Sequence, residues 1–426
     1  MANTLKFGTD GNWATKKGST LAYNDENDRY KPLPFTTTRD SIATRVNKEG
    51  LIEVVGNDVP RIDYTDSEDG ALLLEPSATN LVTYSEDFSN GYWIKTEATV
   101  TLNTTTSPDG SLNASKLTPS TINSNHKIAS GNVSIVSSLT SYWFVKSNGY
   151  SKVSLREDAA VGKYASFDLS QGIVLDSSTS SKIEDYGNGW FRIELNDDLT
   201  NVTARNSLYV LPDSYISGSP NLVNWSADGT SSIFIWGAQS EEGSYATSYI
   251  PTNGSTVTRQ ADTASGAGND VVFNDSEGVL FAEVSTIADS TYKRITISSG
   301  SYHNSIVLDF HNSNSLISRV YVSGSQVTEM TATGLNIEGI NKIAFKYKQN
   351  DFSLWANGIE VGASSSGAIP TGLTGASFDL GGDQPFYGKT KELGYYNTVL
   401  TDEELEYMTS YRTLRRMAKE LNLNKL

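Results

Sequence analysis

The sequence contains no cysteine, and this absence removes disulfide bonds, thiolate metal sites and cysteine nucleophiles from consideration. Only three histidines occur, His126, His303 and His311, and none of them stands in the i, i+4 spacing of a zinc protease. No stretch approaches the roughly 20 apolar residues of a membrane span. The N-terminal stretch also lacks the basic-then-apolar order of a secretion signal. We therefore expect a protein that is made in a cytoplasm and does not insert into membranes.

Positive charge is in deficit, because 33 Lys and Arg stand against 49 Asp and Glu and give a formal net charge of −16. An acidic surface repels phosphate backbones and anionic lipid, so nucleic acid is not an expected partner. Methionine is scarce, with four residues, whereas Gly (35) and Tyr (22) are abundant. This composition is typical of strands and turns rather than of helices.

Alternation of apolar and polar residues recurs through most of the chain. Ile343, Phe345 and Tyr347 share one face of a predicted strand, and three lysines share the other face. A period of two predicts an antiparallel strand with one face buried and the other in water. The pair Asn357-Gly358 follows the next such run and predicts a hairpin, because both residues accept the positive φ of a type I′ turn.

Short strands separated by many Asn-Gly and Asp-Gly pairs favour β-sandwiches over an α/β enzyme. We place boundaries near residue 85 and near residue 262. The polar stretch from Pro251 to Gly268 is interpreted as a linker between two sandwiches.

The C-terminal residues predict a helix. Thr401 and Glu404 have the spacing of a capping box, in which each side chain bonds the backbone of the other residue. Basic residues such as Arg412 and Lys419 favour the far end of the helix dipole. The helix either packs on its own sandwich or joins this chain to other subunits.

A series of motifs between about residue 40 and residue 262 carries a family resemblance. The marks are Pro60-Arg61-Ile62-Asp63-Tyr64, Leu72-Leu73-Leu74-Glu75-Pro76, Ser77-Ala78-Thr79-Asn80-Leu81, Tyr84-Ser85-Glu86-Asp87-Phe88, Gly187-Asn188-Gly189-Trp190-Phe191-Arg192, Ile235-Trp236-Gly237-Ala238-Gln239 and Ala246-Thr247-Ser248-Tyr249-Ile250-Pro251-Thr252. In their order and spacing they resemble phage and prophage virion proteins. The resemblance implies a jelly roll similar to the carbohydrate-binding modules of tail fibres, head fibres and other exposed virion parts. Trp225 departs from this pattern, which has a tyrosine at that place.

Residues 277–400 resemble a second family, the concanavalin-A-like or laminin-G-like sandwiches. The marks are Phe352-Ser353-Leu354-Trp355-Ala356-Asn357-Gly358-Ile359-Glu360 and Leu393-Gly394-Tyr395-Tyr396-Asn397. This resemblance implies a domain that binds glycans or proteins. Sandwiches of both families often carry a structural calcium ion.

Calcium prefers hard oxygen ligands, which the sequence offers in predicted loops at Asp213, Asp228, Asp262 and Asp270. None of these loops has EF-hand spacing, so calcium is left open and no metal ligand is assigned. No other cofactor is expected.

Catalytic motifs are missing from the sequence. No nucleophile elbow, phosphate-binding glycine loop or dinucleotide fingerprint stands in a strand–turn–helix context. Paired carboxylates could hydrolyse glycosides, and candidate pairs are Glu157 with Asp158, Glu241 with Glu242, and Asp379 with Asp383. Neighbouring acids on a strand point to opposite faces, however, so Glu157 and Asp158 are not expected to converge. We predict that the chain is not an enzyme, with a polysaccharide depolymerase as the weaker alternative.

Sugar binding needs an aromatic ring to stack on the apolar face of the sugar and polar groups to bond its hydroxyls. Trp225 offers such a ring, and Asn224 and Asp228 offer the polar groups, all within a predicted turn. Tyr92, which follows Asn90-Gly91, is a second candidate. The opposing interpretation is that these aromatics only pack a turn or the core.

We therefore predict an all-β protein with tandem antiparallel β-sandwiches, a jelly roll and a concanavalin-A-like domain, and a short C-terminal helix. The expected division is an N-terminal anchoring segment at 1–85, the jelly roll at 86–262, the second sandwich at 263–400 and the helix at 401–426. The expected function is that of a structural bacteriophage protein, exposed on the virion, that binds host-surface polysaccharide. Its partners would be other virion subunits and copies of itself. A purely architectural virion protein is the alternative.

Overall fold

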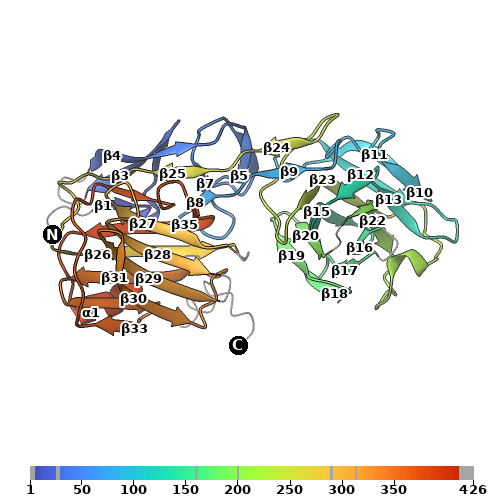
Figure 1. The fold of residues 1–426 in the computed structure, drawn as a ribbon. Coiled ribbons are helices and arrows are strands. Elements are labelled where there is room, and N and C mark those ends of the chain that lie inside the picture. The colour runs from blue at the N-terminus through green and yellow to red at the C-terminus, as the bar shows by residue number, and fades with distance from the viewer. Residues whose placement is uncertain are drawn as a thin grey trace. The chain divides into compact units, whose positions relative to one another are not determined.

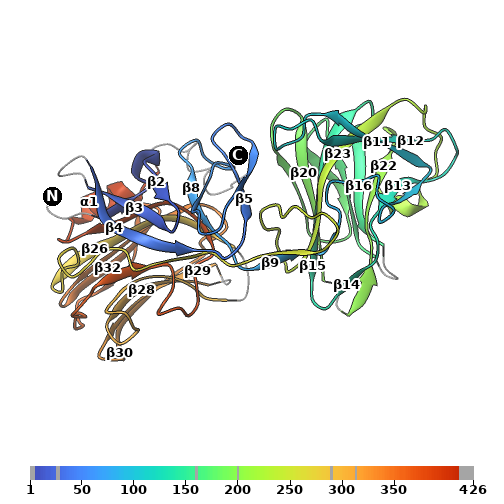
Figure 2. The same ribbon diagram turned by 90° about the horizontal axis from the view of Figure 1, so that it is seen from above.

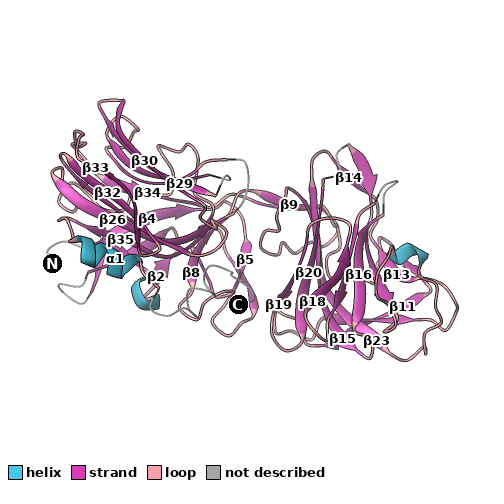
Figure 3. Ribbon diagram, turned by 90° about the horizontal axis from the view of Figure 1, so that it is seen from below, coloured by secondary structure: helices cyan, strands magenta, loops and turns pink. Residues whose placement is uncertain are grey.

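The computed structural model describes residues 5–24, 29–158, 162–198, 201–287, 291–311 and 314–411. Strands dominate these residues (Figure 3), and the predicted all-β class is confirmed. The chain divides into two compact units, each built from segments that are far apart in the sequence. Unit 1 comprises Met1–Ile42, Val55–Pro76 and Gln260–Leu426, and unit 2 comprises Ala43–Val54 and Ser77–Arg259.

Unit 1 is a sandwich of two antiparallel sheets. The larger sheet pairs its strands in the order β25 (Thr263–Ser265), β4 (Arg29–Thr38), β3 (Ser19–Asn24), β1 (Leu5–Phe7), β35 (Gly388–Tyr396), β26 (Glu277–Thr286), β31 (Asn341–Lys348), β32 (Asp351–Ala356) and β33 (Ile359–Ser364). Beside this path, β2 (Ala14–Lys16) pairs with β3, β7 (Arg61–Asp63) pairs with β8, and β8 (Ala71–Leu74) pairs with β35. The smaller sheet has the order β30 (Ser325–Thr333), β29 (Ser315–Val322), β28 (Ser305–His311), β27 (Lys293–Ser298) and β34 (Gly375–Ser377).

The core of unit 1 follows from the alternation seen in the sequence. Ile343 and Phe345 of β31 lie in one hydrophobic core with Ile295 and Leu308 of the smaller sheet. The predicted apolar face is therefore buried between the two sheets. The lysine face differs from the prediction only in part. Lys348 is exposed to water, but Lys342 is only 9 % exposed because other parts of unit 1 cover it.

Unit 2 is a sandwich of two sheets of six strands each. One sheet has the order β10 (Ile94–Thr96), β13 (His126–Ala129), β22 (Asn206–Leu211), β16 (Lys152–Glu157), β17 (Tyr164–Asp168) and β18 (Ile173–Ser177). The other has the order β11 (Ala98–Thr105), β12 (Ala114–Pro119), β23 (Ser232–Glu242), β15 (Leu139–Asn148), β20 (Trp190–Asp197) and β19 (Ser181–Asp185). The remaining described strands form three two-stranded sheets: β5 (Ala43–Val46) with β6 (Ile52–Val55), β9 (Ala78–Asn80) with β24 (Val257–Arg259), and β14 (Val133–Ile135) with β21 (Val202–Ala204).

The N-terminal residues do not form the separate segment that the sequence predicted. Strand β1 pairs with β35, with Lys6 opposite Gly394, so the first strand is part of the same sheet as the C-terminal strands. Figures 1 and 2 show the blue strands β3 and β4 in the same body as the orange strands of unit 1. The reason is that β35 needs a hydrogen-bonding neighbour on each side, and the N-terminal residues supply one of them.

The stretch between residues 251 and 268 is not the free linker that the sequence predicted. Its backbone forms β24, which pairs with β9, and β25, which pairs with β4. Thr252 within it is buried and donates its hydroxyl to the Val82 carbonyl. The polar composition that suggested a free connection therefore reflects hydrogen bonds to strands distant in the sequence.

Two local predictions are confirmed. Asn357 and Gly358 both have positive φ, 53° and 84°, in the hairpin between β32 and β33. The capping box is present at α1 (Asp402–Thr409), where Thr401 accepts from the Glu404 amide and Glu404 accepts from the Thr401 amide. The expected continuation of this helix, with Arg412 and Lys419, lies outside the described residues. No helix in the described part of the chain has the length and hydropathy to cross a membrane.

Candidate functional site

Trp225 lies just after a short 3-10 turn, η2 (Pro220–Leu222), in unit 2. Its ring is half-buried and meets the rings of His126 and Tyr150 edge to face, at centroid distances of 4.9 and 5.1 Å. Its backbone pairs with Ser124 in both directions. Trp225 therefore holds a loop against the core, which is the packing role that the sequence left as the alternative.

Asp228 is exposed but serves its own loop. Its carboxylate accepts from the amides of Thr230 and Ser231, at 2.6 and 2.7 Å, and from the Ser231 hydroxyl at 2.6 Å. The hydroxyl and amide donors of Ser231 and Thr230 hold the pKa of Asp228 well below its usual range. Asn224 is exposed beside Trp225. A sugar hydroxyl at Asp228 would therefore compete with hydrogen bonds that shape the turn.

Tyr92 packs at a different place from Trp225. Its ring stands edge to face on Trp93, at 5.4 Å, and lies so close to Gly131 that a Cβ at Gly131 would be 2.6 Å from it. Gly131 follows the end of β13, whereas Trp225 contacts His126 at its beginning. At about 3.3 Å per residue these two points are roughly 17 Å apart along the strand direction. The structure does not bring the two predicted aromatics together around one sugar ring.

The motifs that carry the virion resemblance form structural connections. Asn80 donates its amide to the carbonyls of Ala238 and Ile250, at 3.3 and 2.9 Å, and Tyr249 bonds the Ser85 hydroxyl at 2.8 Å. These contacts tie the two ends of the segment Ser77–Arg259 to each other and, through Ala238, to strand β23. The motifs therefore specify how the chain enters and leaves the sandwich.

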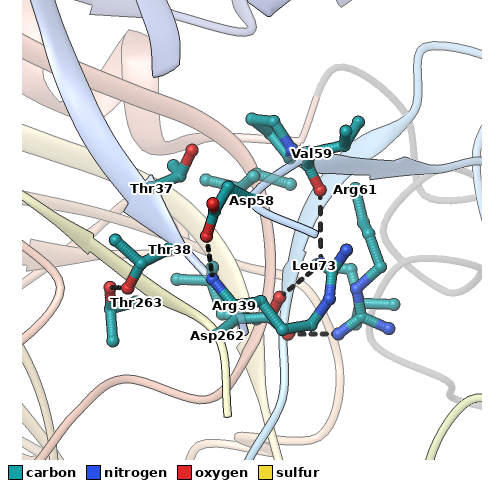
Figure 4. Close-up of a pocket in the computed structure, with 12 residues that line it drawn as sticks. Thr37, Thr38, Arg39, Asp58, Val59, Arg61, Leu73, Asp262 and Thr263 are labelled. Atoms are coloured by element: carbon teal, nitrogen blue, oxygen red, sulfur yellow. Dashed lines mark hydrogen bonds and ion pairs between the residues drawn. The ribbon is translucent and has the colours of Figure 1, made fainter. Parts of the chain in front are cut away.

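In unit 1 the motif residues Arg61 and Glu75 form a buried ion network with two residues outside the motifs, Arg39 and Asp262 (Figure 4). Asp262 accepts from Arg39 at 2.9 Å and from Arg61, and Arg61 also pairs with Glu75 at 2.6 Å. The cavity beside them is about 10 Å³, too small for anything larger than one water molecule. Asp262 is thus an ion-pair partner and not the calcium ligand that the sequence left open. Among the described residues no three Asp, Glu or His side chains gather as metal ligands.

A cleft of about 400 Å³ opens on the outer face of the larger sheet of unit 1. Its walls come from β1, the short turn η1 (Thr9–Gly11), β26, β31, β35 and α1. Gly8 lets η1 approach the sheet, because any Cβ there would lie 2.3 Å from the Lys391 carbonyl oxygen. This cleft is the candidate functional site.

Strand register places three charged residues in one row across the floor of the cleft. Glu392 of β35 is opposite Glu283 of β26, and Glu283 is opposite Lys342 of β31. A bulge in β35 next to Glu392 brings Lys391 to the same place. Like charges directly opposite on neighbouring strands repel, so this row is stable only with compensating partners.

The compensating partners are present. Glu283 is paired with Lys391, at 3.1 Å, and with Lys342, at 3.6 Å. Glu392 instead accepts from the Thr9 hydroxyl at 2.8 Å. Burial raises the pKa of Glu392 above its usual value, the Thr9 hydrogen bond lowers it, and the neighbouring Glu283 raises it further. The two carboxyl groups therefore have different partners and different electrostatic surroundings.

Aromatic rings complete the cleft. Tyr396 of β35 is half-buried and lies 5.7 Å from the Lys6 ammonium, and Tyr407 of α1 is 70 % exposed. Phe281 of β26 forms an apolar part of the floor. A concave site with flat aromatic faces and several hydrogen-bonding groups suits a polar ring compound such as a sugar.

Sequence reasoning missed this site because its residues are scattered from Lys6 to Ser410. The single local signal was the lysine face of β31, which was interpreted as a face in water. The proposed catalytic pairs do not lie here either. Glu157 is buried, whereas Asp158 pairs with Lys127 and Arg156, so these two neighbours diverge as expected.

No protein-family model and no curated protein sequence matches the chain. Solved structures with a similar fold do exist. The carbohydrate-binding module CBM40 of the Ruminococcus gnavus IT-sialidase covers 34 % of this chain and 94 % of its own length, at 18 % identity and a TM-score of 0.29. Mouse laminin α1 domains LG4-5 cover 65 % and 86 %, at 13 % identity and 0.24. Trypanosoma rangeli sialidase covers 93 % and 66 %, at 7 % identity and 0.28.

These likenesses are similarities of fold and assign no activity to this chain. The similar structures include sialidases as well as a carbohydrate-binding module, so they do not support the prediction that the chain is not an enzyme and decide the question in neither direction. That prediction is withdrawn.

Proposed function

We propose that this chain is a glycan-binding structural protein of a bacteriophage virion, and that the cleft of unit 1 holds the glycan. The observation that carries the binding proposal is the cleft itself, with its charged row and the exposed ring of Tyr407. The virion setting is supported by the ordered series of motifs from Pro60 to Thr252. The ligand would be a host-surface polysaccharide, and the place of action the exterior of the particle.

Unit 2 has a different proposed role. Trp225 and Tyr92 are engaged in packing, which favours an architectural function for this sandwich. Its proposed partners are other virion subunits, including copies of this chain. In this arrangement unit 2 attaches the protein to the particle and unit 1 meets the host surface.

The glycan-binding proposal is tested with purified protein on an array of bacterial surface polysaccharides, followed by calorimetry on each polysaccharide that binds. Tyr407→Ala removes an exposed ring of the cleft, and we expect about two- to tenfold weaker binding, since an aromatic stacking contact is worth roughly 0.5–1.5 kcal/mol. Tyr302→Ala is the matched control, because Tyr302 is also exposed, at 49 %, but does not line the cleft. Equal affinities for both variants and the unchanged protein would place the glycan elsewhere.

The virion proposal is tested separately on intact particles. An antibody against this chain should label the particle surface in electron micrographs and reduce adsorption to host cells. Absence of the chain from purified particles would rule out the virion setting and leave the cleft as a glycan site of another kind of protein.

A further inference from the structure

Glu283 and Glu392 are placed for more than binding. They face each other on neighbouring strands, on the side of the sheet that floors the cleft, and cross-strand partners have Cβ atoms about 5 Å apart. We infer that these two carboxyl groups form a catalytic pair that hydrolyses a glycosidic bond of the glycan in the cleft. This inference rests on the proposed glycan-binding function.

The surroundings give the two groups different roles. Glu283 is paired with the ammonium groups of Lys391 and Lys342, which suits the ionised partner of such a pair. The Glu392 carboxylate instead accepts from the Thr9 hydroxyl; burial raises the pKa of Glu392, the Thr9 hydrogen bond and the Lys6 ammonium lower it, Glu283 raises it, and the net direction is upward. A raised pKa retains the proton that a general acid must donate.

The cleft also leaves space for a substrate beside the pair. Gly394 stands between Lys6 and Phe281 in the sheet, so no side chain rises from the floor at that point. Tyr396 and Tyr407 flank the opening as surfaces for neighbouring sugar rings. A pair that only stabilised the fold would not need a cavity of about 400 Å³ next to it.

The reaction proceeds in two steps. Glu392 gives its proton to the glycosidic oxygen as the bond from that oxygen to the anomeric carbon breaks, and a carboxylate oxygen of Glu283 bonds the anomeric carbon. Water then attacks the same carbon, Glu392 takes the proton from the water, and the bond to Glu283 breaks. One water is consumed and one new reducing end appears for each bond cleaved. The close spacing of neighbouring strands favours this double displacement, which retains the anomeric configuration.

The experiment measures reducing ends released from each purified capsular polysaccharide that the full-length protein binds on the array. Glu392→Gln and Glu283→Gln keep the size of each side chain and remove its acid–base function. We expect each variant to lose about 10²–10⁴-fold in cleavage rate and to keep its affinity for the polysaccharide within a fewfold. Glu360→Gln is the matched control, because Glu360 is an exposed residue of the same sheet outside the cleft, and its rate should be unchanged.

The outcomes separate this inference from the proposed function. Binding without release of reducing ends by the unchanged protein overturns the catalytic pair and leaves the binding site standing. Absence of binding to any polysaccharide overturns both. Full cleavage by either Gln variant also overturns the pair.

A second measurement covers the case in which the Gln variants do not fold. Thr9→Val removes the hydroxyl that lowers the pKa of Glu392, so the pKa of this acid should rise. The alkaline limb of the pH–rate profile should then move to higher pH, while the acid limb stays in place. An unchanged alkaline limb would remove Glu392 from the role of general acid.

Discussion

Glu157 shows how burial of a single carboxyl group can make stability depend on pH. It is 1 % exposed on β16 of unit 2, near the equally buried Asp197 of β20. Burial raises the pKa of Glu157 to about 7, with the nearby Ser141 hydroxyl lowering it and the carboxylates of Asp197 and Asp158 raising it. In the unfolded chain this group ionises near its ordinary pKa of 4.5. The stabilising effect of the proton is therefore complete below pH 4.5 and is lost as the pH rises through about 7.

Glu157→Gln should remove this dependence, because the amide stays neutral at every pH. We expect the variant to be more stable than the unchanged protein at pH 8 by about 3 kcal/mol, and similar to it at pH 4. Urea denaturation of both proteins at the two pH values measures the difference. Glu49→Gln, at an exposed position of the same unit, is the control and should show neither effect. Parallel pH profiles for Glu157→Gln and the unchanged protein would contradict the prediction.

Arg61 contributes to the stability of unit 1 through two buried ion pairs. It is fully buried and bonds both Glu75 and Asp262, and these two carboxylates raise its pKa against the lowering effect of burial. Arg61→Met withdraws the guanidinium from two buried acids, and we expect unit 1 to lose about 3–5 kcal/mol.

The comparison for Arg61→Met is Lys348→Met, in the same unit. Lys348 pairs with Glu277 at 2.8 Å but is 48 % exposed, so water screens the pair and its loss should cost far less than the loss of Arg61. Chemical denaturation measures both. Similar losses for the two variants would show that the buried network contributes no more than a surface pair.

At the scale of elements, α1 depends on its capping box and on a few apolar contacts. Leu405 is fully buried with Phe281 and Trp355 on the outer face of the larger sheet, and the helix has only eight residues. An isolated helix of this length is not stable in water, so its cap and its packing decide whether it forms.

Thr401→Ala removes one half of the box, and we expect a loss of about 1 kcal/mol together with faster amide exchange over Asp402–Thr409. Because α1 supplies Tyr407 to the cleft, glycan affinity should fall as well. Hydrogen–deuterium exchange provides the measurement, with Thr371→Ala in an exposed loop as the control. Unchanged exchange in the helix would mean that packing alone maintains it.

At the scale of the whole molecule, both units are discontinuous in the sequence, and this has a consequence for fragments. Residues 263–426, which the sequence suggested as a sandwich and helix, lack the strands β1, β4 and β8 that pair with β35 and β25. We expect this fragment to be insoluble when produced alone, because unpaired edges and part of the core would face water.

A fragment of residues 77–259 retains both six-stranded sheets of unit 2 and should fold, with a β-type circular dichroism spectrum and a single melting transition. It lacks β5 and β6, whose Val46 and Ile52 contribute to a small core, so we expect it to melt below the full chain. A cooperative transition in the 263–426 fragment would show that the N-terminal strands are dispensable.

The sequence by itself determined the features that depend on neighbouring residues. Asn357-Gly358 needs only its own backbone freedom to turn, and Thr401 with Glu404 needs only one helical turn to cap. The same holds for the alternation of Ile343 and Phe345, which fixes the buried face of β31 wherever that strand lies. These short-range preferences were sufficient for the all-β class.

Tertiary structure decided everything that depends on residues distant in the sequence. Lys342 was expected in water, but the sheet places it opposite Glu283, where the N-terminal turn and α1 wall off the same face. Likewise Trp225 was a candidate to meet a sugar, and only the position of His126 revealed that its ring packs a loop. The physical reason is that alternation indicates which side chains share a face, whereas strand pairing alone decides what covers that face.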